Sequence, residues 1–352
     1  MNVADSLFLR TARREPAERT PVWFMRQAGR VLPEYRAVRK RWTLLEICRQ
    51  PELCAEVTLQ PVERLGVDGA VMFADIMLPL IGVGIDIDIV DEVGPVVASP
   101  IRSKAGVEAL RPIEPEEDVP FVLETIRLLD RALGGRIPVI GFSGAPFTLA
   151  AYLIEGRASR DFVNTKALMF SSPDLWHTLM ERLTSIIVAY LRAQIVAGAA
   201  AIQLFDSWVG ALSPADYVAF VQPYSRRIFA ALRTERAPLI HFGTNTASLL
   251  EEMGTDGADI IGVDWRVALD DAWTRVGGDH GIQGNLDPVA LFAPPPYVKS
   301  RVADVLSRAG GRAGHIFNLG HGLLPGTPLE NVQRAVEWVR ELSEAPDPAL
   351  VR

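Results

Sequence analysis

Cysteine is scarce in this sequence. Cys48 and Cys54 are the only two cysteines among 352 residues, and they stand six positions apart. Two cysteines cannot build the disulfide framework of a small secreted domain, and their spacing does not match a Cys-x-x-Cys metal site. We therefore expect both as small apolar residues within one buried helix.

Excess positive charge and long apolar runs are also missing. The net charge is −7, whereas nucleic-acid binding requires a basic patch or stripe. The longest apolar run, residues 69–85, is interrupted by Asp75 and is shorter than the roughly 20 residues that cross a bilayer. The first residues lack the apolar segment of a secretory signal. These features predict a cytoplasmic protein with no membrane segment and no nucleic-acid partner.

A short apolar run followed by a helical stretch recurs along the chain. This alternation is typical of parallel strands covered by helices. We predict a single (β/α)8 TIM barrel, an α/β fold that spans residues 1–352, with residues 1–19 as an N-terminal extension or helix. The eight predicted strands are residues 21–25, 70–73, 138–142, 201–205, 238–242, 260–265, 281–286 and 315–319.

Local patterns refine this fold. Isoleucine and aspartate alternate over residues 85–89 before a turn at 93–96, which predicts a β-hairpin inserted after the second strand. Ser172, Ser213 and Thr327 each precede a proline, which predicts helix starts there, and a glutamate three residues after Thr327 suggests a capping box. A doubly wound sheet is the competing fold, but no Gly-x-Gly-x-x-Gly follows the first strand.

Polar residues gather where the predicted strands end. The working groups of such barrels lie at the carboxyl ends of the strands and on the loops beyond them. These positions carry Arg26, Gln27, Asp75, Ser143, Asp206, Ser207, His241, Asp264, Asn285, Asp287 and His321, with Tyr152 further along.

Asp75 is the most informative of these residues because its neighbours in sequence are apolar and none is basic. A buried carboxylate must be paired, hydrogen-bonded, or placed to receive a ligand that donates N–H groups. Asp75 is therefore either a structural carboxylate that caps backbone amides or a ligand-binding group. The same two alternatives hold for Tyr152, Ser207 and Asp264.

Two arginines flank a glycine after the first predicted strand. Arg26 and Arg30 are four residues apart and share a face if the segment is helical. Guanidinium groups hold carboxylates with paired hydrogen bonds, so this arrangement favours a carboxylate clamp over two unrelated surface arginines. His321 lies between Gly320 and Gly322, so little side-chain bulk shields it, and it is either a loop residue or a ligand-binding group.

Several short segments form a recognisable set of motifs. They are PVWFMRQAGR at 21–30, PEYR at 33–36, FADI at 73–76, GFSGAPFTL at 141–149, AYLIEG at 151–156, FDSW at 205–208, QGNLDP at 283–288 and FNLGHG at 317–322. These segments resemble the uroporphyrinogen decarboxylase family, in the expected order from about residue 20 to 345. Two small departures are Phe147, where the family often has tryptophan, and Ala74, where serine is common.

The resemblance implies a homodimeric enzyme of heme biosynthesis that converts uroporphyrinogen III to coproporphyrinogen III and CO2 without a metal or organic cofactor. It implies that Asp75 accepts the pyrrole N–H groups and that Asp75 and Arg26 are the catalytic residues. It also implies the substrate-binding set, which is Arg26, Gln27, Ala28, Gly29, Arg30, Asp75, Tyr152, Ser207 and His321.

The substrate's own electronics suggest a mechanism. Protonation of a pyrrole ring carbon creates an electron sink into which the bond to the carboxylate can release its electrons. Negative charge on Asp75 would stabilise the positive charge that develops on the pyrrole nitrogen. Arg26 is the family-based proton donor, but an arginine pKa exceeds roughly 12, so proton donation by Arg26 needs its surroundings or a water relay.

Two other functions compete with this one. A zinc-dependent methyltransferase acting on a corrinoid or thiol would share the barrel, but its zinc is held by a His-x-Cys pair and a distant cysteine. The matching stretch here is His241-Phe242-Gly243, which has no thiol. A non-catalytic porphyrin carrier is the second competitor, and in a carrier Asp75 would not affect any rate.

Overall fold

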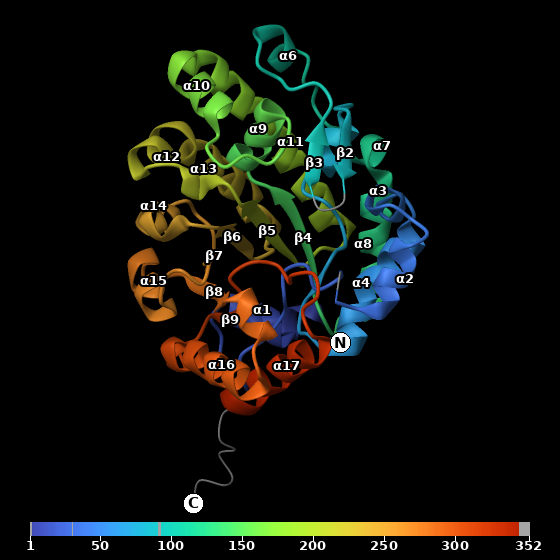
Figure 1. Ribbon diagram of the computed structural model, residues 1–352, viewed down its shortest axis with the longest axis vertical. Coiled ribbons are helices and arrows are strands. Elements are labelled where there is room, and N and C mark those ends of the chain that lie inside the picture. Colours follow the sequence, from blue (N-terminus) through green and yellow to red (C-terminus); the bar gives the residue numbers. More distant parts are fainter. Residues whose placement is uncertain (1, 30, 91–92, 345–352) are drawn as a thin grey trace, which may run out of the picture.

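The computed structural model describes residues 2–29, 31–90 and 93–344. Seven parallel strands form one curled sheet in the order β1-β4-β5-β6-β7-β8-β9, and Figure 1 shows the helices arranged around these strands. The strands are β1 (Ala70–Val71), β4 (Val139–Gly144), β5 (Ala201–Asp206), β6 (Leu239–Gly243), β7 (Ile260–Gly262), β8 (Gly281–Leu286) and β9 (His315–Leu319).

The first predicted strand, residues 21–25, closes the barrel as a single bridge between Val22 and Phe317. The Phe317 amide donates to the Pro21 carbonyl at 2.9 Å, and the Trp23 amide donates to the Phe317 carbonyl at 3.3 Å. On the other side, the Asp68 amide donates to the Val22 carbonyl at 2.7 Å, just before β1. The predicted (β/α)8 barrel is confirmed, with its first strand reduced to this bridge.

Polar side chains cross the interior of the barrel. Gln283 on β8 donates to Gln203 on β5 at 2.9 Å, although these strands are not neighbours in the sheet. The indole of Trp23 donates to Gln283 at 3.0 Å. All three side chains are buried, so the barrel is filled by side chains and the site must lie at one of its ends.

The helices cover the outside of the sheet. The 25-residue α11 buries Leu179, Leu183, Ile186 and Tyr190 along one face, as the spacing of its apolar residues predicts. The helices are α1 (Leu7–Ala12), α2 (Pro33–Arg39), α3 (Leu44–Cys48), α4 (Pro51–Leu65), α5 (Leu78–Gly82), α6 (Lys104–Glu108), α7 (Pro115–Asp118), α8 (Pro120–Leu133), α9 (Pro146–Glu155), α10 (Val163–Ser171), α11 (Pro173–Ala197), α12 (Pro214–Phe220), α13 (Gln222–Leu232), α14 (Leu250–Met253), α15 (Leu269–Val276), α16 (Pro295–Ala309) and α17 (Leu329–Ser343).

Short elements complete the chain. The predicted hairpin is confirmed as antiparallel strands β2 (Ile87–Val90) and β3 (Gly94–Val97), which follow β1 and α5. The expected N-terminal helix is α1. Short 3-10 turns are η1 (Val3–Asp5), η2 (Val209–Ala211), η3 (Arg233–Glu235), η4 (Thr246–Ser248) and η5 (Pro288–Phe292).

Some local predictions were wrong. Cys48 ends α3 and Cys54 lies in α4, because Pro51 disfavours helical backbone at Gln50 and a new helix begins there. Ser213 caps α12 as predicted, whereas the Ser172 side chain caps nothing. The Thr327 hydroxyl donates to the Leu324 carbonyl at 2.8 Å and forms no capping box.

No helix in the described part of the chain is long and apolar enough to span a membrane.

Candidate functional site

The mouth of the barrel is the end at which the carboxyl termini of the parallel strands meet. Segment 21–25 leads to Arg26, β1 leads to Asp75, and β9 leads to His321. Tyr152 lies on α9 after β4, and Ser207 directly follows β5. The structure therefore brings five of the predicted site residues to the same end of the barrel.

Asp75 is half-buried at this mouth. Its Oδ1 accepts the Met77 amide at 2.9 Å, in the turn that leads into α5, and no described residue donates a hydrogen bond to Oδ2. Burial raises the pKa of Asp75 above its ordinary value, although the Met77 amide and the charge of Arg26 oppose this rise. Asp75 therefore combines a fixed orientation with one oxygen available to a ligand.

Arg26 carries an exposed side chain on a backbone with φ of 59°, a left-handed conformation that is uncommon outside glycine. A Cβ atom on Gly322 would lie 2.6 Å from the Arg26 Cγ, so only glycine leaves room for this side chain. The charge of Arg26 lowers the pKa values of Asp75, Tyr152 and His321.

Residues 27–29 form the turn after Arg26. The Gln27 side chain is buried, accepting the Phe24 amide at 2.9 Å and donating to the Gly69 carbonyl at 2.8 Å. The Gln27 amide also donates within the protein, to the Phe24 carbonyl at 3.0 Å. Ala28 and Gly29 are buried, and their amides have no acceptor among the described residues. Arg30 lies outside the described residues.

His321 is held in one tautomer. Its Nδ1 accepts the Gly322 amide at 2.6 Å, so the proton of the neutral ring resides on Nε2. Burial and the charges of Arg26 and Arg266 together lower the pKa of His321 to about 4, against the opposing charge of Asp264. At neutral pH, His321 is therefore an uncharged hydrogen-bond donor.

Tyr152 and Ser207 lie at the same end of the barrel, after β4 and β5. Burial and the charge of Asp75 together raise the pKa of Tyr152 to about 12, so the phenol stays protonated. The Tyr152 ring packs against Trp208 with ring centroids 5.9 Å apart. Ser207 is half-buried, and its carbonyl accepts the Thr244 hydroxyl at 2.5 Å.

Other strand-end residues serve structural roles. His241 and Asp206 point outward toward the helices, where His241 lies 3.6 Å from Asp206 and 3.3 Å from Asp256. Burial favours neutral His241, but both carboxylates outweigh it and raise its pKa to about 9. Asn285 donates to the carbonyls of Asp264 and Val267 at 2.9 and 2.7 Å.

Arg266 is the residue at this mouth that the sequence analysis missed. It follows Asp264 by two positions at the end of β7, and its charge reaches His321. Its position could have been noticed in the sequence, because Arg266 directly follows the predicted strand 260–265.

The sequence profile of the family described as Uroporphyrinogen decarboxylase (URO-D) matches residues 4–342. The chain belongs to the uroporphyrinogen decarboxylase family. A uroporphyrinogen decarboxylase from Carboxydothermus hydrogenoformans is 54% identical over 96% of this chain and 97% of its own length. Another from Thermus thermophilus is 54% identical over 97% of this chain and 100% of its own length.

Solved structures support the fold of this uroporphyrinogen decarboxylase family member. A methyltransferase from Methanosarcina mazei matches with a TM-score of 0.80 and 21% identity, covering 95% of this chain and 97% of its own. At 21% identity, this structural similarity supports the fold of the chain and not its function. The predicted zinc alternative is not favoured, because His241 is engaged by Asp206 and Asp256 while Gly243 occupies the position of the expected thiol.

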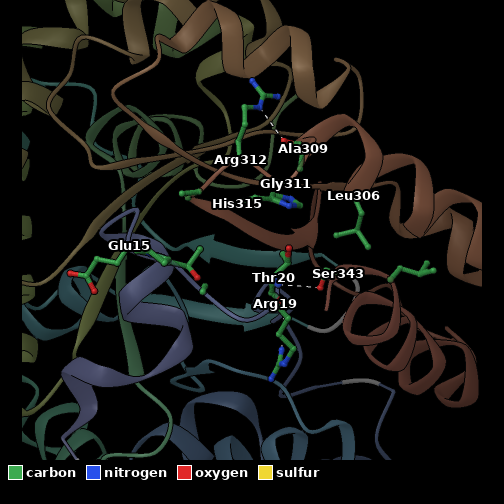
Figure 2. A pocket seen from close by; sticks show the side chains of 15 residues that line it. Glu15, Arg19, Thr20, Leu306, Ala309, Gly311, Arg312, His315 and Ser343 are labelled. Carbon is green, nitrogen blue, oxygen red and sulfur yellow. Dashed lines mark hydrogen bonds between the residues drawn. The ribbon is translucent and has the colours of Figure 1, made fainter. Parts of the chain in front are cut away.

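A separate cavity of about 390 Å³ lies beside the amino end of β9, and Figure 2 shows the side chains that line it. Its lining includes His315, at the start of β9, and Arg19. Arg19 is already engaged with both oxygens of Asp68 at 2.7 and 2.8 Å. This cavity contains none of the predicted site residues.

Proposed function

We propose that this chain removes the four acetate carboxyl groups of uroporphyrinogen III, yielding coproporphyrinogen III and CO2 in tetrapyrrole biosynthesis. The observation that carries the proposal is the placement of Asp75 at the barrel mouth, with one free oxygen, within electrostatic reach of Arg26. The substrate pairs inward-pointing pyrrole N–H donors with peripheral carboxylates, and the mouth offers a complementary acceptor and cation.

Each predicted residue has a distinct role in this proposal. Asp75 accepts the pyrrole N–H groups, while Arg26 and Arg30 bind peripheral carboxylates. His321 donates its Nε2 proton to a carboxylate, and Tyr152 and Ser207 complete the polar lining. The amides of Ala28 and Gly29 add donors beside Arg26, and Gln27 braces the turn that holds them.

The reaction begins with protonation of the pyrrole carbon next to an acetate-bearing carbon, which leaves an iminium-like positive charge on the ring nitrogen. The bond between the methylene carbon and the carboxylate then breaks. CO2 leaves, and the electron pair forms an exocyclic double bond that neutralises the ring. Protonation of the exocyclic carbon and loss of the ring proton give the methyl group.

Asp75 stabilises the charged intermediate because its carboxylate lies where the pyrrole nitrogen becomes positive. A partly desolvated carboxylate interacts more strongly with such a charge than one in bulk water. Arg26 is the proposed proton donor, acting with a water relay because guanidinium releases its proton only above roughly pH 12. The chemistry needs no external electron sink, so the proposal includes no cofactor.

The decisive experiment is anaerobic incubation of the purified protein with uroporphyrinogen III in chelator-treated buffer. Chromatography of the oxidised products should show stepwise loss of four carboxyl groups. Absence of any product with fewer carboxyl groups would overturn the proposed activity. Recovery of activity only after zinc is added would instead favour a metal-dependent reaction.

The proposal also includes a homodimer in the cytoplasm. Sedimentation equilibrium should give twice the mass of one chain, and a monomer mass at working concentration would contradict this part alone.

A further inference from the structure

Arg266 forms a fixed cationic shelf at the barrel mouth. Its guanidinium carbon lies 4.1 Å from the centroid of the Trp265 ring, and its Nη1 donates to Asp264 at 2.6 Å. Its side chain is nevertheless 44% exposed. A stacked and ion-paired arginine loses little further freedom on binding a ligand, because its geometry is already set.

The anchor beneath this shelf is Asp264, whose side chain is only 2% exposed. Its carboxylate accepts the Arg266 amide at 2.9 Å and the Asn245 amide at 2.6 Å, in addition to the Arg266 guanidinium. Asp264 is therefore fully engaged by the backbone and one Nη1 hydrogen. The Nε and Nη2 groups of Arg266 donate to no described residue.

The loop after β9 brings this shelf to the predicted site. A Cβ atom on Gly320 would lie 2.5 Å from the Trp265 amide nitrogen, and one on Gly322 would lie 2.6 Å from the Arg26 Cγ. Gly320 therefore packs against the segment that carries Arg266, and Gly322 packs against Arg26. His321 lies between these two glycines in the sequence. The charges of Arg26 and Arg266 both lower the pKa of His321, in agreement with this packing.

We propose that Arg266 is a further substrate-binding residue, which holds a peripheral carboxylate of the tetrapyrrole with its free guanidinium hydrogens. The inference rests on the proposed function, because a substrate with several carboxylates around one ring needs donors at more than one point of the rim. Arg26 and His321 supply donors beside Gly322, and Arg266 supplies them beside Gly320.

A purely structural role, in which Arg266 only neutralises Asp264, makes different predictions. In that role, loss of the guanidinium would lower stability and leave the KM of the folded enzyme unchanged. In the proposed role, loss of the guanidinium raises KM, and kcat stays nearly constant because the contact exists in both ground and transition states.

The test compares Arg266→Gln, Arg266→Lys and wild type in anaerobic assays at several salt concentrations. Arg266→Gln keeps an amide that can donate to Asp264, and should raise the KM for uroporphyrinogen III about 5- to 20-fold with kcat within about twofold. The KM of Arg266→Lys should lie between those of wild type and Arg266→Gln, because lysine keeps the positive charge but loses the paired N–H donors of the guanidinium. The KM of Arg266→Gln should also rise less steeply with salt than that of wild type.

Arg131→Gln is the matched control. Arg131 is a 61% exposed arginine in the last turn of α8, on the outer helical layer, and it also pairs with one carboxylate. The same change in net charge there should leave KM at the wild-type value. An unchanged KM in folded Arg266→Gln, or an equal rise in both variants, would overturn the role of Arg266. A wild type without decarboxylase activity would instead overturn the proposed function.

Discussion

The Arg26 side chain packs directly against the backbone of Gly322, where a Cβ atom would lie 2.6 Å from the Arg26 Cγ and 3.0 Å from its Cβ. Carbon atoms pack at about 3.5 to 4.0 Å. The glycine after His321 is therefore part of the site, because it determines where the arginine lies. The first prediction follows from this contact.

Gly322→Ala should displace Arg26 and leave the fold intact, because the arginine side chain is exposed and does not pack in the core. A displacement of about 1 Å can cost roughly 100-fold in turnover. Anaerobic kinetics should show kcat/KM reduced by about 10- to 100-fold. Gly278→Ala is the control, because no atom lies within 4 Å of the added Cβ. Equal kinetics in the two variants would contradict the packing argument.

Asp75→Asn should fold normally, because asparagine keeps the oxygen that accepts the Met77 amide. It removes the negative charge opposite the developing cation, and loss of one preorganised electrostatic group costs on the order of 100- to 1,000-fold in kcat. Rapid-quench assays and a urea unfolding curve measure the two effects separately. Turnover within a factor of two of wild type would refute the catalytic role.

The pH profile offers an independent check on Asp75. Burial raises its pKa, and the proposed mechanism needs the ionised form. Activity should therefore fall on the acid side as the pH drops through a pKa above the ordinary range of aspartate. This limb should be absent from the residual activity of Asp75→Asn. An identical acid limb in both proteins would assign it to another group.

Three histidines, His241, His315 and His321, should give the free energy of unfolding a maximum near pH 6.5. Burial lowers the pKa values of His315 and His321 to about 4, so the unfolded chain binds more protons than the folded one between pH 6.5 and 4. Stability is lost as the pH falls through that window. Asp206 and Asp256 overcome the effect of burial and raise the pKa of His241 to about 9, so its contribution is complete below pH 6.5 and lost as the pH rises toward 9.

Each such proton changes stability by on the order of 1 kcal/mol per pH unit within its window. Urea unfolding at closely spaced pH values measures both limbs. His241→Gln should be less stable at neutral pH and should lose the alkaline limb. An alkaline limb that persists in His241→Gln would show that another group produces it.

Thr148 couples the buried Asp206 to the mouth. Its hydroxyl donates to Asp206 at 2.9 Å and accepts the Trp208 amide at 3.2 Å, in the turn that carries Ser207. Thr148→Val should cost about 1 to 3 kcal/mol of unfolding free energy, because it leaves buried polar groups unpaired. It should also raise KM by loosening Trp208 against Tyr152.

Thr148→Ser should recover both properties because it restores the hydroxyl. Thr184→Val is the control, since Thr184 is equally buried and its hydroxyl has no partner among the described residues. If Thr148→Val has a normal KM, Thr148 contributes to the stability of the fold and not to substrate binding.

Much of the site was predictable because a barrel converts order along the chain into position in space. Once the strands were recognised, residues that follow them, such as Asp75, Ser207 and His321, had to meet at one end. The prediction failed where side-chain direction mattered. His241 and Asp206 also end strands, but they face the helices and pair with each other, because alternate residues of a strand point to opposite faces.

The sequence by itself determined the barrel, the hairpin, the family and the end at which the site lies, since these depend on apolar periodicity and local motifs. Only the tertiary structure decided which polar side chains pair with one another and which remain available to a ligand. Asp75 follows β1 and Asp264 follows β7 in the same sheet. Asp264 accepts hydrogen bonds from Arg266 and from backbone amides, whereas one oxygen of Asp75 accepts none from any described residue. Each aspartate accepts the amide two residues later, and the difference is that Asp264 also accepts the Arg266 guanidinium and the amide of Asn245 from the loop after β6. The Asn245 amide reaches Asp264 only because the fold places the loops after β6 and β7 side by side.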